Sequence, residues 1–233
     1  MMKIMRPIAI LAMSAGLLAC GGEAANGGTT PDSAKEIGEA TTNGIAGVLP
    51  DDMVVGAADA PVTVIEYASV TCPSCAAFHK QIYPEIKAKF IDTGKVKFVF
   101  REFPTPPVEF ALIGSVLARC AAEKTGSDGY FIVLNGLFQN QRSWIGGADP
   151  KAELLKIAGQ AGMDEVAFDN CLKQQKYVDM INETVRAGSE AFGISSTPSF
   201  VIDGEKVTIR SVEDFEKRLN ALHAAATGEN ASE

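Results

Sequence analysis

The pattern of hydrophobic and polar residues predicts a strand, a helix and a second strand in the first part of the folded region. The run from Val62 to Ala68 is rich in β-branched and aromatic side chains, which is typical of a buried strand. From Ala76 to Ile91 apolar residues recur at helical spacing, and Gly94 ends that helix. Val96 to Phe100 predicts a second strand, which the prolines at 104, 106 and 107 stop.

The next part of the chain predicts helices and no strand. Between Val108 and Gly193 no run has the alternation or β-branched content of a strand. Five stretches have helical spacing, namely Phe110 to Glu123, Tyr130 to Gln139, Lys151 to Ala161, Glu165 to Gln174 and Tyr177 to Phe192. We expect Gln139 to Arg142 to be a solvated loop. The single tryptophan, Trp144, is expected to lie in a loop and to join the core of this helical block.

The chain closes with a hairpin and a helix. Two short β-runs, Ser199 to Ile202 and Lys206 to Ile209, flank Asp203-Gly204, which is a strong hairpin signal. Val212 to Ala225 has helical spacing. These patterns predict an α/β core at residues 51–107 and 194–226 that brackets an all-α helical insertion at 108–193. Residues 227–233 are expected to be a disordered tail.

The first nineteen residues differ in kind from the rest. Lys3 and Arg6 precede an uncharged, mostly apolar run from Ile8 to Leu18, which is typical of a secretion signal. The run is shorter than the roughly 20 apolar residues that span a bilayer. The Leu-Leu-Ala sequence before Cys20 resembles the bacterial lipobox, which implies a lipoprotein signal peptide at 1–19 and acylation of Cys20. The alternative is an ordinary cleavage site with an incidental cysteine.

Residues 20–50 are rich in Gly, Ala, Thr and Asn, which indicates a flexible tether. We therefore expect a protein of the periplasm or cell envelope that is held at a membrane by its lipid alone. The absence of aspartate directly after Cys20 resembles the sorting signal for the outer membrane.

Composition excludes some classes of protein. The chain has 233 residues, of which 46% are hydrophobic, so it can bury a sizeable core. Its net charge of −8 and its lack of Lys and Arg clusters argue against nucleic acid as a partner. Acylation of Cys20 would leave four of the five cysteines, a number that can form pairs in an oxidising compartment.

Cys72 and Cys75 form a Cys-x-x-Cys motif where the first strand passes into the first helix. Pro73 suits the first turn of that helix. Unpaired N–H groups and the helix dipole favour a thiolate at the first sulfur, so Cys72 is the expected nucleophile. Cys75 is one turn further into the helix and is expected to resolve mixed disulfides.

The same spacing could be half of a zinc site, which would need two further ligands. The chain has no second Cys-x-x-Cys motif, and its only histidines are His79 and His223. We expect His79 to be an exposed helix residue, and we predict no metal and no other cofactor.

The strand from Val64 to Ser69, the Cys72-Pro73-Ser74-Cys75 motif, the helical insertion and Ser196-Thr197-Pro198 together resemble the DsbA family of thiol–disulfide oxidoreductases with a thioredoxin fold. The resemblance covers roughly residues 54–225. It implies a cis peptide bond before Pro198 beside the two cysteines. It also implies that the backbone of Thr197 binds the substrate chain.

Glu66 lies on the strand before Cys72 among apolar residues, which makes a buried carboxyl plausible. The resemblance implies that it shuttles a proton for Cys75. The alternative is a carboxylate at the strand edge that faces solvent.

Cys120 and Cys171 both fall in the helical block. The resemblance implies a structural disulfide between them. Two free buried thiols and a second redox pair are the alternatives.

Exchange of disulfides with unfolded or partly folded exported proteins is the expected function, and introduction of disulfides is its expected direction. An oxidase needs a DsbB-type membrane partner that removes electrons. Ser74, in place of the histidine usual in strongly oxidising relatives, and Thr197 instead favour a reductase or isomerase with a DsbD-type partner. A binding or chaperone module without turnover is the third hypothesis.

Overall fold

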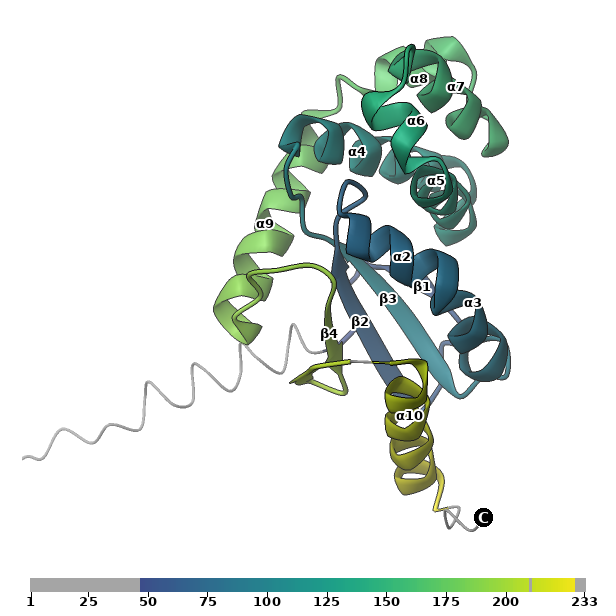
Figure 1. Ribbon diagram of the computed structural model, residues 1–233, viewed down its shortest axis with the longest axis vertical. Coiled ribbons are helices and arrows are strands. Elements are labelled where there is room, and N and C mark those ends of the chain that lie inside the picture. The colour runs from purple at the N-terminus through teal and green to yellow at the C-terminus, as the bar shows by residue number, and fades with distance from the viewer. Residues whose placement is uncertain (1–46, 210, 229–233) are drawn as a thin grey trace, which may run out of the picture.

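The computed structural model describes residues 47–209 and 211–228. Figure 1 shows a twisted sheet with helices on both faces and a block of helices at one end. The strands are β1 (Met53–Val55), β2 (Val62–Ala68), β3 (Val96–Glu102), β4 (Ser199–Ile202) and β5 (Glu205–Val207). The expected signal peptide, Cys20, the tether up to residue 46 and the tail from residue 229 lie outside the described residues.

The helices follow the chain from the sheet into the insertion and back. They are α2 (Pro73–Gln81), α3 (Tyr83–Ile86), the π-helix η1 (Lys87–Ile91), α4 (Val108–Thr125), α5 (Ser127–Gln139), α6 (Gln141–Gly146), α7 (Pro150–Gln160), α8 (Glu165–Cys171), α9 (Gln175–Phe192) and α10 (Val212–Thr227). The expected α/β thioredoxin fold with an all-α insertion, the DsbA-like arrangement, is confirmed.

The strand order is β1-β3-β2-β4-β5. β2 and β3 are parallel, so the chain must cross over between them, and α2, α3 and η1 make that crossing. β4 is antiparallel to β2, which places Glu66 between Phe100 on one side and Phe200 on the other. The active-site strand is therefore central in the sheet and buried on both faces.

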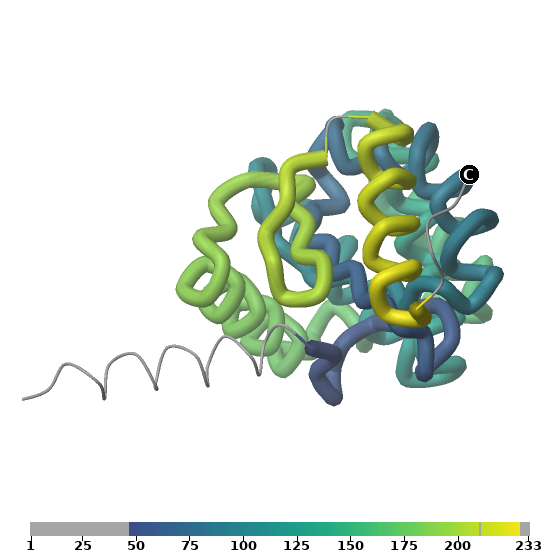
Figure 2. Tube along the Cα trace, turned by 90° about the horizontal axis from the view of Figure 1, so that it is seen from below, coloured from purple at the N-terminus to yellow at the C-terminus, as the bar shows by residue number. Residues whose placement is uncertain are grey.

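The two faces of the sheet are covered by different helices. On one face, Phe78 of α2 packs against Phe200 of β4 and Phe215 of α10, with ring centroids 4.9 Å and 6.2 Å away. On the other face, α9 comes so close to β2 that a Cβ on Gly188 would lie 2.5 Å from the Tyr67 ring. Figure 2 shows α9 and α10 on opposite sides of the β4–β5 hairpin.

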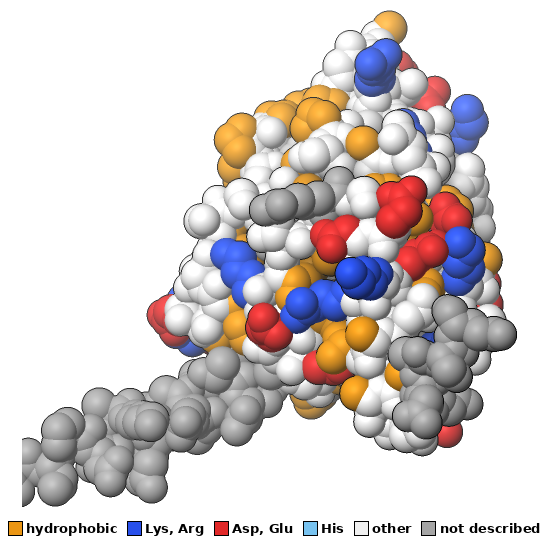
Figure 3. Space-filling view, turned by 60° about the horizontal axis from the view of Figure 1, so that its bottom comes forward, with side chains coloured by type: hydrophobic (Ala, Val, Ile, Leu, Met, Phe, Trp, Pro, Cys, Tyr) orange, Lys and Arg blue, Asp and Glu red, His pale blue; other side chains and the backbone are white. Residues whose placement is uncertain are grey.

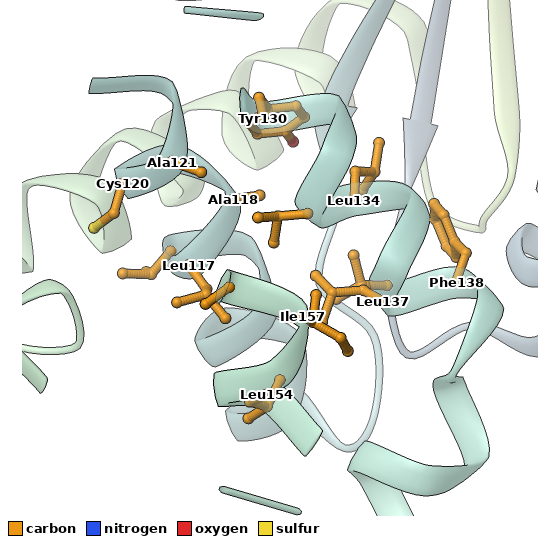
Figure 4. Close-up of a cluster of buried hydrophobic side chains, with 14 of the residues drawn as sticks. Leu117, Ala118, Cys120, Ala121, Tyr130, Leu134, Leu137, Phe138, Leu154 and Ile157 are labelled. Atoms are coloured by element: carbon orange, nitrogen blue, oxygen red, sulfur yellow. The ribbon is translucent and has the colours of Figure 1, made fainter. Parts of the chain in front are cut away.

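The insertion has its own hydrophobic core, which is continuous with the active-site helix. Leu117, Leu134 and Ile157 meet where α4, α5 and α7 pack together (Figure 4). The same buried cluster includes Cys75 and Ala76 of α2. The insertion therefore packs directly against the helix that carries the two thiols.

A buried ion pair also joins the insertion to the sheet. The Arg119 guanidinium of α4 donates to both carboxylate oxygens of Glu102 at the end of β3. The Tyr130 hydroxyl of α5 donates to Glu102 Oε1 at 2.8 Å. These bonds set the position of α4 and α5 relative to the sheet.

Three features differ from the sequence-based expectation. β1 was not predicted, because three residues are too few to show a β-pattern. The predicted helix over residues 76–91 is divided near Ile82, since Pro84 at the start of α3 has no N–H to continue the ladder of α2. Residues 141–146 form α6, so a loop there was wrong, whereas Trp144 is buried in the core as expected.

Surface charges of both signs are interspersed on the face shown in Figure 3. Lys89 of η1, for example, bonds Glu85 and also Glu216 of α10, each at 2.6 Å. None of the helices in the described part of the chain has the length and apolarity to cross a membrane.

Candidate active site

Cys72 and Cys75 lie at the amino end of α2, where the parallel strand β2 ends. Cys72 is the N-cap residue, with extended backbone angles and no side-chain cap, and Pro73 follows in the first turn. Cys72 is 8% exposed and Cys75 is 0% exposed. Both thiols are free in this structure. Solvent and substrate can therefore reach only the first sulfur.

The Cys72 sulfur has two polar neighbours. It lies 3.0 Å from the Ser74 hydroxyl and 3.5 Å from the Thr197 carbonyl oxygen. The Ser74 hydroxyl is also 3.3 Å from that carbonyl, but it has a single hydrogen and can donate to only one of the two. A thiolate is the stronger acceptor, so ionisation of Cys72 draws the Ser74 hydrogen to sulfur and leaves the Thr197 carbonyl for another donor.

The two cysteines have opposite acidities. Hydrogen bonding from the Cys75 thiol, opposed by burial and assisted by the Ser74 hydroxyl, lowers the pKa of Cys72 to about 4. The Thr197 carbonyl can only accept, so it favours the protonated form. Burial, the hydrogen bond to Cys72 and the charge of Glu66 raise the pKa of Cys75 well above its ordinary range. Cys72 is therefore a thiolate at neutral pH and Cys75 a thiol.

The bond between Thr197 and Pro198 is cis. Pro198 leads directly into β4, so the sheet places this bond against the amino end of α2. A groove of about 200 Å³ runs beside it, lined by Ser74, Ala77, Phe78, Gln81, Ile82, Pro198, Phe200, Ile209 and Ser211. The groove is mostly apolar, and one residue that lines it, Ser74, has its hydroxyl 3.0 Å from the Cys72 sulfur.

The turn between β2 and α2 is held by the hydroxyl groups of Ser69 and Thr71. Ser69 Oγ and Thr71 Oγ1 are 2.8 Å apart, and Thr71 Oγ1 donates to the Thr105 carbonyl at 2.8 Å. The Thr105 N–H in turn donates to Ser69 Oγ at 3.1 Å. These bonds tie the turn before Cys72 to the loop after β3.

Glu66 is fully buried beneath the site, and its charge raises the pKa of Cys75. His79 Nε2 lies 2.8 Å from Glu66 Oε2. The expectation that His79 is exposed was wrong, because the aromatic residues around it and the insertion cover this face of α2: His79 is 3% exposed and stacks on Phe138 of α5.

Gln141 of α6 is a site residue that sequence analysis missed. Its Nε2 donates to the carbonyl oxygens of Val70 and Cys72, at 2.9 Å and 3.1 Å. The expectation of a solvated loop at Gln139 to Arg142 was wrong because this amide supports the active-site turn. No signal in the sequence distinguished it, because four consecutive polar residues are ordinary between two helices.

Cys120 of α4 and Cys171 of α8 form a disulfide, with their Cα atoms 5.9 Å apart. Both are buried in the insertion, and Cys171 Sγ contacts the Val116 carbonyl. Within residues 47–209 and 211–228, no three His, Cys, Asp or Glu side chains are grouped so that they could hold a metal ion.

The family model described as thioredoxin matches residues 49–221 of the chain. The chain belongs to the thioredoxin family. Among solved structures, this thioredoxin-family chain is similar to Wolbachia pipientis alpha-DsbA1, with a TM-score of 0.71, 29% sequence identity, and coverage of 81% of this chain and 98% of that one. This likeness supports the DsbA-like resemblance read from the motifs.

Several curated relatives of the thioredoxin-family chain have names that describe disulfide chemistry. A Rickettsia bellii protein named "Putative protein-disulfide oxidoreductase" is 33% identical over 166 residues, which are 70% of this chain and 62% of that protein. The "Disulfide bond formation protein D" of Bacillus subtilis is 42% identical over 99 residues, covering 40% of this chain and 42% of that one. The chain thus spans less than two thirds of the curated relatives it matches.

Proposed function

We propose that the protein is a thiol–disulfide oxidoreductase that introduces disulfides into exported proteins through Cys72 and Cys75. The observation that carries this proposal is the opposite acidity of the two sulfurs. An accessible Cys72 with a pKa of about 4 is a good nucleophile and a good leaving group. A buried Cys75 that stays protonated suits the thiol that attacks from inside.

In the proposed reaction, a substrate thiolate attacks the Cys72 sulfur of the oxidised Cys72–Cys75 pair. The bond between Cys72 and Cys75 breaks, and Cys75 leaves as a thiolate that takes up a proton. A second substrate thiolate then attacks the substrate sulfur of the mixed disulfide and releases Cys72 as a thiolate. Two electrons pass from the substrate dithiol to the cysteine pair, and a disulfide forms in the substrate.

The substrate segment would lie as an extended strand beside Pro198. The Thr197 backbone supplies polar groups for strand-like hydrogen bonds, and ionisation of Cys72 frees its carbonyl from Ser74. The apolar groove along Phe78 and Phe200 suits the hydrophobic side chains that unfolded proteins expose. Shape and backbone bonds, without a charged pocket, favour broad selectivity.

The acidity of Cys72 favours the oxidising direction. A stabilised thiolate lowers the free energy of the reduced protein, and this makes its disulfide easier to reduce. The Ser74 hydroxyl supplies one hydrogen bond where a histidine would supply a cation, which leaves a reductase or isomerase as the second candidate.

An oxidase must pass its electrons on, so we propose a DsbB-type membrane partner that reoxidises the pair. The proposed location is the periplasmic side of the cell envelope, with a lipid on Cys20 as the anchor and the outer membrane as the favoured site.

The reduction potential of the Cys72–Cys75 pair in the full chain, titrated against glutathione, tests the direction. A value near or above about −150 mV supports the oxidase, whereas one below about −220 mV supports the reductase or isomerase. A Cys75→Ser variant tests the class of protein. Mixed disulfides with envelope proteins should accumulate in an enzyme, and their absence would identify a binding module.

A further inference from the structure

Glu66 and His79 form a buried polar pair below Cys75 with one unused atom on each side chain. His79 Nε2 and Glu66 Oε2 are 2.8 Å apart, and the two side chains are 1% and 0% exposed. Glu66 Oε1 and His79 Nδ1 are buried and have no hydrogen-bond partner. A pair with idle polar atoms in an apolar core is expensive to keep, which points to a use beyond packing.

The unpartnered Nδ1 of His79 indicates which ring nitrogen carries the hydrogen. A buried N–H without an acceptor is costlier than a bare ring nitrogen, so Nδ1 carries no hydrogen and Nε2 donates to Glu66 Oε2. On Glu66, the bond from His79 then occupies Oε2. Its Oε1 remains the single open position for a proton.

The ring of His79 is held firmly in this orientation. It stacks on Phe138, with centroids 4.2 Å apart and an interplanar angle of 15°. Tyr83 lies on it at 4.9 Å, and Phe78 meets it edge-on at 5.4 Å. Three aromatic rings from α2, α3 and α5 therefore aim Nε2 at the carboxylate.

Few charged or titratable groups of the described chain face Glu66. Cys75 and His79 do so from α2, Tyr83 from α3 and Tyr130 from α5, and the charge of Glu66 contributes to the raised pKa of Cys75 and of both tyrosines. Its neighbours on β3 and β4 are phenylalanines. Cys75 is therefore the group with an ionisable proton that the reaction must move.

We propose that His79 is a positioning residue: its bond holds Glu66 Oε2 and leaves Oε1 as the acceptor for the proton of Cys75. The inference rests on the proposed thiol–disulfide exchange and deepens it. When Cys75 must attack, its proton passes from Sγ to Glu66 Oε1, while Oε2 keeps the bond from His79. The charge of the three side chains stays at −1 throughout.

The Cys75 thiolate then attacks the Cys72 sulfur of a mixed disulfide. The bond from Cys72 to the bound thiol breaks, the released sulfur leaves as a thiolate, and the Cys72–Cys75 disulfide forms. In the opposite direction Cys75 leaves as a thiolate and recovers the proton from Glu66. Without His79, both carboxylate oxygens would be buried and unpartnered, which disfavours the charged form of Glu66 and makes it a poorer acceptor near neutral pH.

Oxidised glutathione is the probe for the test. The reduced full chain is mixed with it, samples are quenched with acid, and mass spectrometry follows the glutathione adduct of Cys72 and its conversion to the internal disulfide. Formation of the adduct tests the proposed function. Its conversion by Cys75, measured from pH 5 to pH 9, tests the inference, so the two can fail separately.

Two substitutions separate the hydrogen bond from the packing. His79→Phe keeps a ring against Phe138 and removes the donor, and His79→Gln keeps a donor near the position of Nε2. We expect His79→Phe to slow conversion about tenfold at pH 7 and to shift its pH dependence upward by about one unit, because loss of the hydrogen bond to the carboxylate would raise the proton affinity of Glu66 about tenfold. His79→Gln should restore most of the rate and the original profile.

A third comparison covers the case in which His79→Phe folds poorly. In a Glu66→Gln background the His79→Phe substitution should leave the pH profile of conversion unchanged, because the group that it acts through is gone. An equal loss of rate in His79→Phe and His79→Gln with an unshifted profile would overturn the inference. So would a shift of the same size with and without Glu66.

Discussion

The Ser74 hydroxyl lies 3.0 Å from the Cys72 sulfur, at the amino end of the helix that carries both. It is one of the groups that lower the pKa of Cys72 to about 4. We expect Ser74→Ala to raise that pKa by about one unit, because a hydrogen bond to a charged group contributes on the order of 1.5 kcal/mol. Ultraviolet absorbance of the thiolate, followed against pH, measures the change.

The matched control is Ser143→Ala, which removes a hydroxyl from α6 near the same helix without touching Cys72. Its thiolate titration should match that of the unaltered protein. An unchanged titration in Ser74→Ala would mean that the Cys75 thiol and the helix terminus alone stabilise the thiolate.

The acidity of Cys72 should make the reduced protein more stable as pH rises. In the folded protein its pKa is about 4, against an ordinary value of about 8.5 in an unfolded chain. Between these limits the unfolded chain binds a proton that the folded chain does not, so the stabilisation is complete above about pH 8.5 and is lost as pH falls through 4. Cys75 is a thiol in both states over most of this window, since its folded pKa is raised.

The free energy of unfolding of the reduced protein, measured with denaturant from pH 4 to pH 8.5, should therefore increase relative to that of the oxidised protein. The oxidised form has no thiol at the site and provides the reference. In the Cys72→Ser variant, the free energy of unfolding should vary with pH as it does in the oxidised protein. Parallel curves for the two redox forms would contradict the low pKa of Cys72.

Gln141 should matter for the active-site turn although it lies outside the thioredoxin core. Gln141→Glu replaces the amide that donates to Val70 and Cys72 with a negative charge. Two carbonyl oxygens lose their donor and the Cys72 thiolate gains a like charge, so the pKa of Cys72 should rise by about one unit or more. Stability should fall by about 1 to 3 kcal/mol.

Gln139→Glu is the control, because it adds the same charge at the exposed end of α5, in a pocket that Gln141 also lines. Gln139→Glu should change the pKa of Cys72 and the stability of the protein much less than Gln141→Glu does. Equal effects from the two substitutions would mean that the charge acts through the surface and that the hydrogen bonds of Gln141 are dispensable.

The disulfide between Cys120 and Cys171 should contribute to stability and should not take part in disulfide exchange. It joins α4 to α8 across a sequence separation of 51 residues. Replacing both cysteines by alanine should lower the free energy of unfolding by about 4 kcal/mol on the chain-entropy view, measured by urea unfolding. The titration of Cys72 should stay the same. A loss of disulfide exchange with stability unchanged would instead identify a second redox pair.

Local sequence was sufficient wherever local physics decides the structure. The Asp203-Gly204 turn needs positive φ at both residues, and their values are 46° and 84°. A Cys-x-x-Cys motif between a buried strand and a helix places its first sulfur at the N-cap, as found for Cys72. These features depend on neighbours within a few residues, so they can be predicted from the sequence.

The contacts of His79 and Gln141 could not be predicted from local sequence patterns. The helical spacing put His79 on the same face as Cys75, but it could not say that Phe138 from the insertion would cover that face. Gln141 reaches the Cys72 carbonyl across a sequence separation of 69 residues. No periodicity in either segment encodes the other, so both contacts depend on how the insertion is seated.

The sequence by itself therefore determined the class of fold, the two reactive sulfurs and their place at the start of a helix, because helix termini and turn residues act over a few residues. The tertiary structure alone decided the surroundings of those sulfurs: the unexposed Cys75, the His79 bond to Glu66 and the Gln141 support of the turn. Acidity depends on burial and on the nearest polar atoms, and packing of distant segments brings those atoms together.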